Sequence, residues 1–260
     1  MARPTQVPAD PGRRRLITAL AAAGGTLLSG CGQESSPPTY GNVLRLADNL
    51  TYRAQRLLLP RNALAKEYER RDITSIAAIG TTNPADPAQE QYNAAGGALY
   101  DRLRANQFAD WRLVVEGHVA RPGSFSLEDL RRLPARTQVT RHTCEEGWTA
   151  IAEWTGVPLA RVLQAVGVRP DARYVNFVAY DDNPDSIDMV DALHPQTILA
   201  YGMNGRELPV AHGAPLRLRV ERQLGYKNVK FLQRIVVSDR FLDPGPLGPP
   251  RSGWAWYVGI

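Results

Sequence analysis

The sequence predicts a mixed α+β fold dominated by strands, and three of its features carry that prediction. From Trp111 onward, short runs of β-branched and apolar residues alternate with turns that contain Gly or Pro. Short helical patterns with capping residues separate some of these runs. The dipeptide Asn204-Gly205 predicts a tight hairpin, because both positions tolerate the positive φ that a two-residue turn needs. No repeat is visible, so we expect one mixed, strand-rich domain.

The chain before Trp111 has weaker signals. Residues 40–75 are rich in Arg and lack a strong cap, which predicts irregular surface structure with a short helix. The density of Gly and Pro from Gly80 to Pro87 predicts an ordered loop. Gln89–Asn106 has a helical pattern whose middle is weakened by Gly96-Gly97.

Two later helices have clear boundaries. Ser126 is a good N-cap and is followed by acidic residues in the first turn, and Pro134 ends that helix. Pro158 is suited to the first turn of a second helix, Leu159–Val166, which ends at Gly167.

Four runs read as strands. Trp111–Gly117 alternates like a half-buried strand, and Tyr174–Tyr180 is apolar and β-branched enough to be fully buried. Leu216–Glu221 alternates strictly, and the region of Ile235–Val237 alternates more loosely. The strict alternation of Leu216–Glu221 is typical of a strand with one solvated face.

Charge and hydropathy exclude two classes of function. Of the 260 residues 43% are hydrophobic, which is enough for one sizeable core, and no run of 18 apolar residues suggests a membrane span. The net charge is +5, but four arginines and one aspartate place +3 of it in residues 1–30. The remaining net charge of +2 does not indicate a basic surface for binding a nucleic acid, so no nucleic acid is expected as a partner.

The N-terminus reads as an export signal. Arg13-Arg14-Arg15 precedes a short apolar run, Leu16–Leu28, in a layout that resembles a twin-arginine signal for cargo that is exported after folding. Leu28–Cys31 resembles a lipoprotein processing box, so lipidation of Cys31 would tether the protein to the outer face of a membrane. The alternative is an uncleaved basic N-terminus in which Cys31 has no role.

These features predict three parts of the chain. Residues 1–31 are the signal peptide with its lipobox, residues 32–74 form a spacer and an N-terminal extension, and residues 75–260 form the main domain. The expected location is the periplasm or the cell surface.

Cys144 is the only cysteine apart from Cys31. Its neighbours Arg141 and His142 are expected to lower the pKa of the thiol and favour the thiolate. Three interpretations compete: a buried structural thiol, a nucleophile paired with a histidine as in cysteine hydrolases, or a metal ligand whose partners come from outside the protein. The histidines have no ligand spacing. They are His118, His142, His194 and His212.

A second stretch, His212–Lys230, offers fixed donors. Arg217 and Lys230 lie on strand-like segments with Asn228 between them, which suits a phosphate group. The alternative is that Arg217 and Arg219 form the solvated face of a strand.

Five spaced motifs occur together in order. They are Arg141-x-x-Cys144-x-x-Gly147-Trp148, Trp154-x-Gly156-x-Pro158-Leu159, Met203-Asn204-Gly205 with Leu208-Pro209, His212-Gly213-x-Pro215-Leu216-Arg217, and Gly225-x-Lys227-x-Val229-Lys230. Over roughly residues 75–260 this set resembles the molybdopterin-binding domain of the sulfite oxidase family, which includes periplasmic methionine sulfoxide reductases.

The resemblance implies one molybdenum–molybdopterin cofactor per chain, with Cys144 as the only protein ligand of the metal. It also implies transfer of an oxygen atom to or from a small substrate. The positions that match the family's cofactor contacts are Asn83, His212, Arg217, Asn228, Val229 and Lys230.

The chain departs from the sulfite-oxidising pattern around its cysteine. The sulfite-oxidising family members have an arginine pair shortly after the ligand cysteine, and it serves their anionic substrate. In this chain Glu145 and Glu146 follow Cys144 instead. A further family contact falls on Ala179, which lacks the side chain to make it. Tyr257 resembles the family's late tyrosine, which would donate a hydrogen bond to the oxo group at the metal. The alternative is that Tyr257 is an aromatic plug that closes the core.

The resulting prediction is an exported molybdenum oxidoreductase, without haem, that exchanges electrons with a separate membrane or c-type cytochrome. Reduction of a sulfoxide-type oxide is preferred, because carboxylates in the pocket would repel sulfite. The alternatives are a sulfite dehydrogenase, a non-catalytic cell-envelope protein of the same fold, and the cysteine hydrolase.

Overall fold

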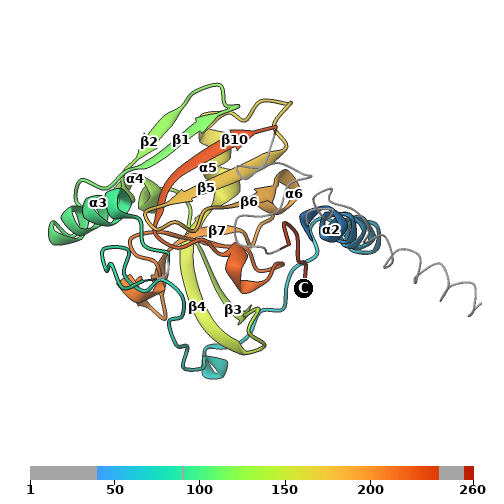
Figure 1. Ribbon diagram of the computed structural model, residues 1–260, viewed down its shortest axis with the longest axis horizontal. Helices are drawn as coiled ribbons and strands as arrows, with labels where there is room; N and C mark the ends of the chain where they lie inside the picture. Colours follow the sequence, from blue (N-terminus) through green and yellow to red (C-terminus); the bar gives the residue numbers. More distant parts are fainter. Residues whose placement is uncertain (1–39, 90, 240–254) are drawn as a thin grey trace, which may run out of the picture. The chain divides into compact units, whose positions relative to one another are not determined.

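Two β-sheets organise the chain (Figure 1). The computed structural model describes residues 40–89, 91–239 and 255–260, with only the backbone for residues 40–46. The first sheet has the strand order β2-β1-β10-β5-β6, and all its neighbours are antiparallel except the parallel pair β1 and β10. Its strands are β1 (Leu113–Gly117), β2 (Gly123–Phe125), β5 (Tyr174–Ala179), β6 (Asp185–Asp188) and β10 (Leu232–Ser238).

The second sheet is antiparallel and has the order β3-β4-β7-β8, with β9 paired to β7. Its strands are β3 (Arg136–Thr143), β4 (Thr149–Pro158), β7 (Ile198–Met203), β8 (Arg206–Glu207) and β9 (Arg217–Arg219). The mixed, strand-rich α+β architecture that the sequence predicts is therefore confirmed.

Short helices connect and cover the sheets. The α-helices of the described residues are α2 (Tyr40–Leu58), α3 (Ala94–Ala105), α4 (Leu127–Arg132), α5 (Leu159–Val166) and α6 (Met189–Ala192). The 3₁₀ turns are η1 (Arg70–Asp72), η2 (Val210–His212) and η3 (Gly225–Lys227). Because α5 buries Leu159, Val162 and Leu163, it joins the same apolar core as strands β1, β5 and β10.

Local signals in the sequence predicted several boundaries correctly. Ser126 caps α4 in a reciprocal capping box with Asp129, and Gly167 ends α5 in the left-handed conformation at φ 67°. Asn204 and Gly205 adopt φ values of 51° and 74° in the turn between β7 and β8.

The predicted helix Gln89–Asn106 begins later than expected, at Ala94, with Asn93 as its N-cap. Gly96 and Gly97 allow α3 to pack closely against two other segments of the chain. A Cβ atom on Gly96 would lie 2.1 Å from the carbonyl oxygen of Tyr180, and one on Gly97 would lie 2.5 Å from that of Pro84. Only a residue without a side chain allows α3 to lie this close to both segments.

The prediction of irregular structure with a short helix before residue 75 was wrong for α2, which has 19 residues. Tertiary contacts stabilise this helix. Arg56 forms ion pairs at 3.0 Å with both Asp188 and Asp191, and Gln55 donates to the carbonyl of Gly259 at 3.0 Å. Contacts between residues so distant in sequence leave no local signal, which explains the error.

Residues Gly41–Ile260 form one compact unit. None of the helices in the described part of the chain is both long and apolar enough to cross a membrane. The predicted signal peptide, lipobox and the spacer before residue 40 lie outside the described residues. The predicted division of the chain at residues 31 and 74 stays a prediction.

Candidate active site

Cys144 lies in the tight turn that joins β3 to β4. The strands pair in register from Arg136 with Gly156 to Thr143 with Thr149. The Cys144 amide donates to the Trp148 carbonyl at 2.9 Å, and Gly147 takes φ 90°, a value that favours glycine. This turn places the Cys144 sulfur at a cavity, where the residue is 3% exposed.

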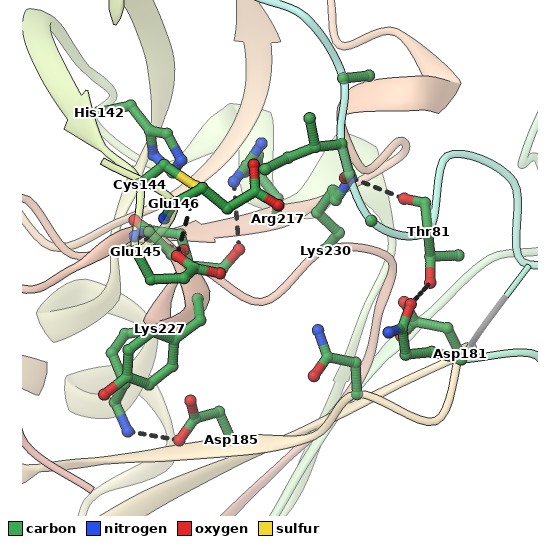
Figure 2. Close-up of a pocket in the computed structure, with 18 of the residues that line it drawn as sticks. Thr81, His142, Cys144, Glu145, Glu146, Asp181, Asp185, Arg217, Lys227 and Lys230 are labelled. Atoms are coloured by element: carbon green, nitrogen blue, oxygen red, sulfur yellow. Dashed lines mark hydrogen bonds and ion pairs between the residues drawn. The ribbon is translucent and has the colours of Figure 1, made fainter. Parts of the chain in front are cut away.

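The cavity has a volume of about 590 Å³ and is formed by segments distant in sequence. Figure 2 shows His142, Cys144, Glu145 and Glu146 on one side and Lys230, Thr81 and Asp181 across from them. Further parts of the wall come from Ile76–Gly80, from Gln91 and Tyr92, from Trp148, from Asp182–Ser186 at the start of β6, from residues between His212 and Asn228, and from Ala255 and Trp256. The two stretches singled out in the sequence therefore meet at one cavity.

The Cys144 thiol does not have the lowered pKa that the sequence predicts. Burial raises its pKa to about 11, and the carboxylates of Glu145 and Glu146 add to the rise. The thiol donates to Glu145 Oε2 at 3.6 Å. The prediction was wrong because side chains alternate along β3: Arg141 turns away and lies over the Tyr68 ring, 5.3 Å from its centroid.

His142 is a neutral imidazole with a defined tautomer. Its Nδ1 lies 2.7 Å from Arg219 Nη1, which can only donate, so the ring proton is on Nε2. Burial, followed by the charges of Arg219, Arg217 and Lys230, lowers the pKa of His142 to about 2. The lone pair on His142 Nδ1 accepts the hydrogen bond from Arg219, so His142 cannot accept a proton from the Cys144 thiol. This arrangement argues against the thiol–imidazole pair of a cysteine hydrolase.

Arg217 is a buried cation and Lys230 a partly buried one, and both donate hydrogen bonds only to carbonyl oxygens among the described residues. Arg217 donates to the carbonyls of His212 at 2.9 Å and Asn228 at 3.2 Å, and its Nε has no partner. Lys230 donates to three carbonyls, those of Ile79, Thr81 and Ala211, at 2.7–3.2 Å. Burial lowers the pKa of Arg217 to about 9 and that of Lys230 to about 7. The solvated-face alternative was wrong, because β9 is buried along its whole length.

The other predicted cofactor contacts differ in position. His212 lines the cavity, and burial lowers its pKa to about 4. Asn228 also lines it, but its amide bonds Leu224, Gly225 and Val220 and so holds the η3 turn. Val229 is a core residue at 1% exposure, and Asn83 caps its own loop by accepting from the Ala85 amide. Neither Val229 nor Asn83 lines the cavity.

Tyr257 also lies outside the cavity lining. Its hydroxyl donates to Gln55 Oε1 at 2.8 Å, and its ring packs edge-on against Tyr52 at 5.0 Å between centroids. This arrangement is the one that the aromatic-plug alternative predicts, with α2 and the C-terminal segment closing on each other.

The sequence analysis did not single out Asp181, and it named Lys227 only as part of the fifth motif, without a role. Asp181 lines the cavity at 4% exposure, its Oδ1 has no partner, and burial raises its pKa to about 6. Lys227 is buried and pairs with Asp185. The one signal that pointed to them is their place directly after a buried strand and within the fifth motif.

A family model for the oxidoreductase molybdopterin binding domain matches residues 102–243, more than half of the chain. The chain belongs to the molybdopterin-binding oxidoreductase family. The predicted family and enzyme class are thereby confirmed, and a cofactor of the molybdopterin class follows from the family. The cysteine hydrolase interpretation was wrong.

Curated relatives of this oxidoreductase agree. A putative protein-methionine-sulfoxide reductase subunit YedZ1 from Azospira oryzae is 36% identical over 96% of this chain and 88% of the relative. The protein-methionine-sulfoxide reductase catalytic subunit MsrP from Xanthomonas campestris is 29% identical over 90% and 71%. Among solved structures, the sulfane dehydrogenase SoxCD from Paracoccus pantotrophus matches 52% of this chain and 39% of its own, with 28% identity and a TM-score of 0.49.

The cavity of this oxidoreductase fits a molybdopterin cofactor. A thiol suits a soft metal, and the orphaned Arg217 Nε, in the same cavity as a Lys230 that has no carboxylate partner among the described residues, suits a phosphate. A buried cation without a carboxylate partner carries a desolvation cost that a bound anion would offset.

Proposed function

We propose that the chain is a molybdenum oxidoreductase that removes the oxygen atom from a small sulfoxide-type oxide at the Cys144 cavity. The observation that carries this proposal is the combination in one cavity of a thiol and two cations, the buried Arg217 and the partly buried Lys230, that have no carboxylate partner among the described residues. A soft ligand and cations without a carboxylate partner in the same cavity are what a metal carried by a phosphorylated organic cofactor requires.

Three side chains would hold the cofactor. Cys144 would bind the molybdenum as a thiolate, since metal binding displaces the thiol proton despite the raised pKa of the free thiol. Arg217 and Lys230 would bind the phosphate. When bound, the molybdenum would supply the two-electron redox change that oxygen-atom transfer needs.

The cavity walls favour a neutral substrate. The carboxylates of Glu145 and Glu146 line the cavity beside Cys144, so an anion such as sulfite would meet like charge there. A sulfoxide has no net charge, and its oxygen needs a donor, for which the Nε2–H of His142 is available at the cavity wall. Both curated relatives carry the name of methionine sulfoxide reductase subunits.

The reaction needs two electrons and two protons, because breaking the sulfur–oxygen bond yields the sulfide and one water. Asp181 lines the cavity and, with a pKa of about 6, can hold a proton near neutral pH. The chain contains no C-x-x-C-H motif, so we propose that a separate membrane or c-type cytochrome delivers the electrons and that the protein has no haem of its own.

We also propose that the enzyme works in the periplasm or at the cell surface. The consecutive arginines before Leu16–Leu28 support twin-arginine export, and Leu28–Cys31 supports a lipid anchor at Cys31. Export of folded cargo suits a protein whose cofactor must be inserted before export.

The test is metal and pterin analysis of the protein exported from a molybdenum-replete host, followed by assays with sulfoxides, N-oxides and sulfite. About one molybdenum per chain is expected, with turnover of sulfoxides. Cys144→Ser should abolish turnover while the fold persists, because the two side chains are similar in size. Cys31→Ser is the matched control and should keep full turnover in detergent-free extract.

Three outcomes would contradict the proposal. Folded, exported protein without molybdenum would favour a non-catalytic envelope protein. Full activity in Cys144→Ser would remove the ligand assignment. Turnover of sulfite in preference to sulfoxides would make the enzyme a sulfite dehydrogenase. Under the proposal, Glu145→Gln with Glu146→Gln should raise sulfite turnover, whereas in a sulfite dehydrogenase it should leave sulfite turnover unchanged.

A further inference from the structure

The exposed large apolar side chains of the described residues concentrate in one region. Five of the seven are leucines within 15 residues of one another, on α2 and directly after it. These leucines, with their exposed fractions, are Leu50 (59%), Leu57 (85%), Leu58 (76%), Leu59 (42%) and Leu64 (59%). Here they are called the leucine surface.

The other two exposed apolar residues belong to segments that hydrogen-bond to the same stretch. Leu193 precedes His194, whose Nε2 lies 3.0 Å from the carbonyl of Ala63. The Ile260 amide donates to Arg222, and Arg222 in turn donates to the carbonyl of Arg61 at 2.6 Å. The segments of Leu193 and Ile260 are therefore tied to the stretch that follows α2.

Helical geometry separates the leucine surface from the face of α2 that contacts the rest of the protein. Tyr52, Gln55 and Arg56 make the inward contacts, with Trp256, Gly259 and Asp188 respectively. Leu50, Leu57 and Leu58, together with Ala54, are exposed and recur at the spacing of the opposite helical face. The helix, the blue element in Figure 1, thus has an inward face of polar and aromatic residues and an outward apolar face.

The exposed charges of this stretch up to Lys66 are basic, whereas the exposed Glu67 and Glu69 that follow pair with Arg136 and Arg71. Between Ala47 and Lys66 the exposed charged side chains are Arg53, Arg61 and Lys66, and all three are basic. Asp48, the acidic residue of this stretch, is only partly exposed. An apolar helical face bordered by basic residues is the pattern of a helix that lies in the interface of an anionic bilayer.

We propose that the leucine surface docks onto an anionic phospholipid bilayer, with the leucines at the acyl boundary and the flanking basic residues among the lipid phosphates. The position of α2 in the chain supports a bilayer as the occupant. Eight residues separate the predicted lipid attachment at Cys31 from the start of α2 at Tyr40. Such a linker spans at most about 30 Å, so α2 would lie close to the membrane surface. The proposal does not depend on the catalytic function, so either can fail alone.

The experiment places a probe on α2 without removing a leucine. In the full chain with Cys31→Ser and Cys144→Ser, Ala54→Cys is the only thiol and receives an environment-sensitive fluorophore. Ala105→Cys, on an exposed position of α3, is the matched control. Protein bound to vesicles of phosphatidylcholine and phosphatidylglycerol is isolated by flotation, and quenching by brominated lipid is measured.

At position 54 we expect a blue-shifted emission and strong quenching, and at position 105 neither. Leu57→Gln with Leu58→Gln should lower the inserted fraction by about tenfold or more, whereas Leu57→Met with Leu58→Met should preserve it. Arg53→Gln with Arg61→Gln should weaken insertion into anionic vesicles by about 30-fold, since each basic residue contributes about fivefold near such a surface.

Water-like emission at position 54 in vesicle-bound protein would overturn the proposal. So would a blue shift that appears without vesicles as protein concentration rises, because that result would assign the leucine surface to a second copy of the chain. Equal insertion into vesicles of phosphatidylcholine alone would contradict the role of the basic residues.

Discussion

Arg217 and Arg219 lie two residues apart on β9, and both are buried, at 5% and 1% exposure. Both guanidinium groups lie over the Trp154 ring, 4.9 and 4.5 Å from its centroid. Their polar partners differ. Arg219 forms two bonds with Glu221, at 3.1 and 2.7 Å, whereas Arg217 binds only backbone carbonyls and has an orphaned Nε.

The difference separates a structural cation from one that is kept for a ligand. The charge of Arg219 is compensated inside the protein, and its remaining bond fixes the His142 ring at the cavity wall. The charge of Arg217 is not compensated, so the protein carries its desolvation cost until an anion binds. The same distinction applies to Lys227, which pairs with Asp185, and Lys230, which binds three carbonyls.

The largest effect is expected for Glu221→Gln. This change leaves Arg219 charged and buried without its carboxylate, which should destabilise the cofactor-free protein by about 3–5 kcal/mol. Urea unfolding measures the free energy of unfolding. Replacing both residues of the pair by leucine should cost less than Glu221→Gln alone; a larger loss in the double variant would contradict the view of Arg219 as a compensated structural cation.

Asp181→Asn tests the opposite case, a buried carboxylate with an unsatisfied oxygen. Burial raises its pKa from 3.8 to about 6, so the folded state favours the protonated form. This contribution to stability is complete below about pH 4 and is lost as pH rises through 6. In the cofactor-free protein, the free energy of unfolding of Asp181→Asn should therefore rise relative to that of the wild type as pH rises, by about 3 kcal/mol at pH 8. Unfolding measured from pH 4 to 8 checks this, and a difference that does not change with pH would count against it.

Arg217→Gln should separate cofactor binding from stability. Loss of a charge-assisted bond of about 1.5–3 kcal/mol should lower the molybdenum and pterin content of exported protein well below that of the wild type. The free energy of unfolding of the cofactor-free protein should not fall by more than about 1 kcal/mol, since a buried uncompensated charge is removed. Full cofactor content with reduced stability would place Arg217 in the same class as Arg219.

The smallest effect is expected at the surface. Arg234 and Glu116 form an ion pair at 3.1 Å between two side chains that are 45% and 40% exposed. Glu116→Gln should change the free energy of unfolding by less than about 0.5 kcal/mol, because solvent screens the pair. Thermal unfolding of Glu116→Gln and Glu221→Gln, measured in parallel, compares an Arg–Glu ion pair at the surface with one in the core.

Much of the fold could be predicted because its signals are local. The capping box at Ser126, the left-handed Gly167 and the Asn204-Gly205 turn depend on residues within a few positions of one another. The role of the two glycines in α3 and the length of α2 could not, because they depend on Tyr180, Pro84, Asp188 and Asp191, which lie elsewhere in the chain.

The candidate site divides in the same way. The motifs around Cys144, Arg217 and Lys230 were visible in the sequence, and these three residues do line one cavity. The sequence did not reveal that burial raises the pKa of Cys144, or that Arg219 fixes the tautomer of His142. It also left open whether Tyr257 faces the metal site or Gln55.

By itself, then, the sequence determined the family, the order of short-range elements and the residue types available for a metal and a phosphate. Only the tertiary structure decided which of two alternating arginines has an internal carboxylate and which is left for a ligand. The physical reason is that residue type determines what a side chain can bind, whereas burial and the partners brought by distant segments determine whether that capacity is already used.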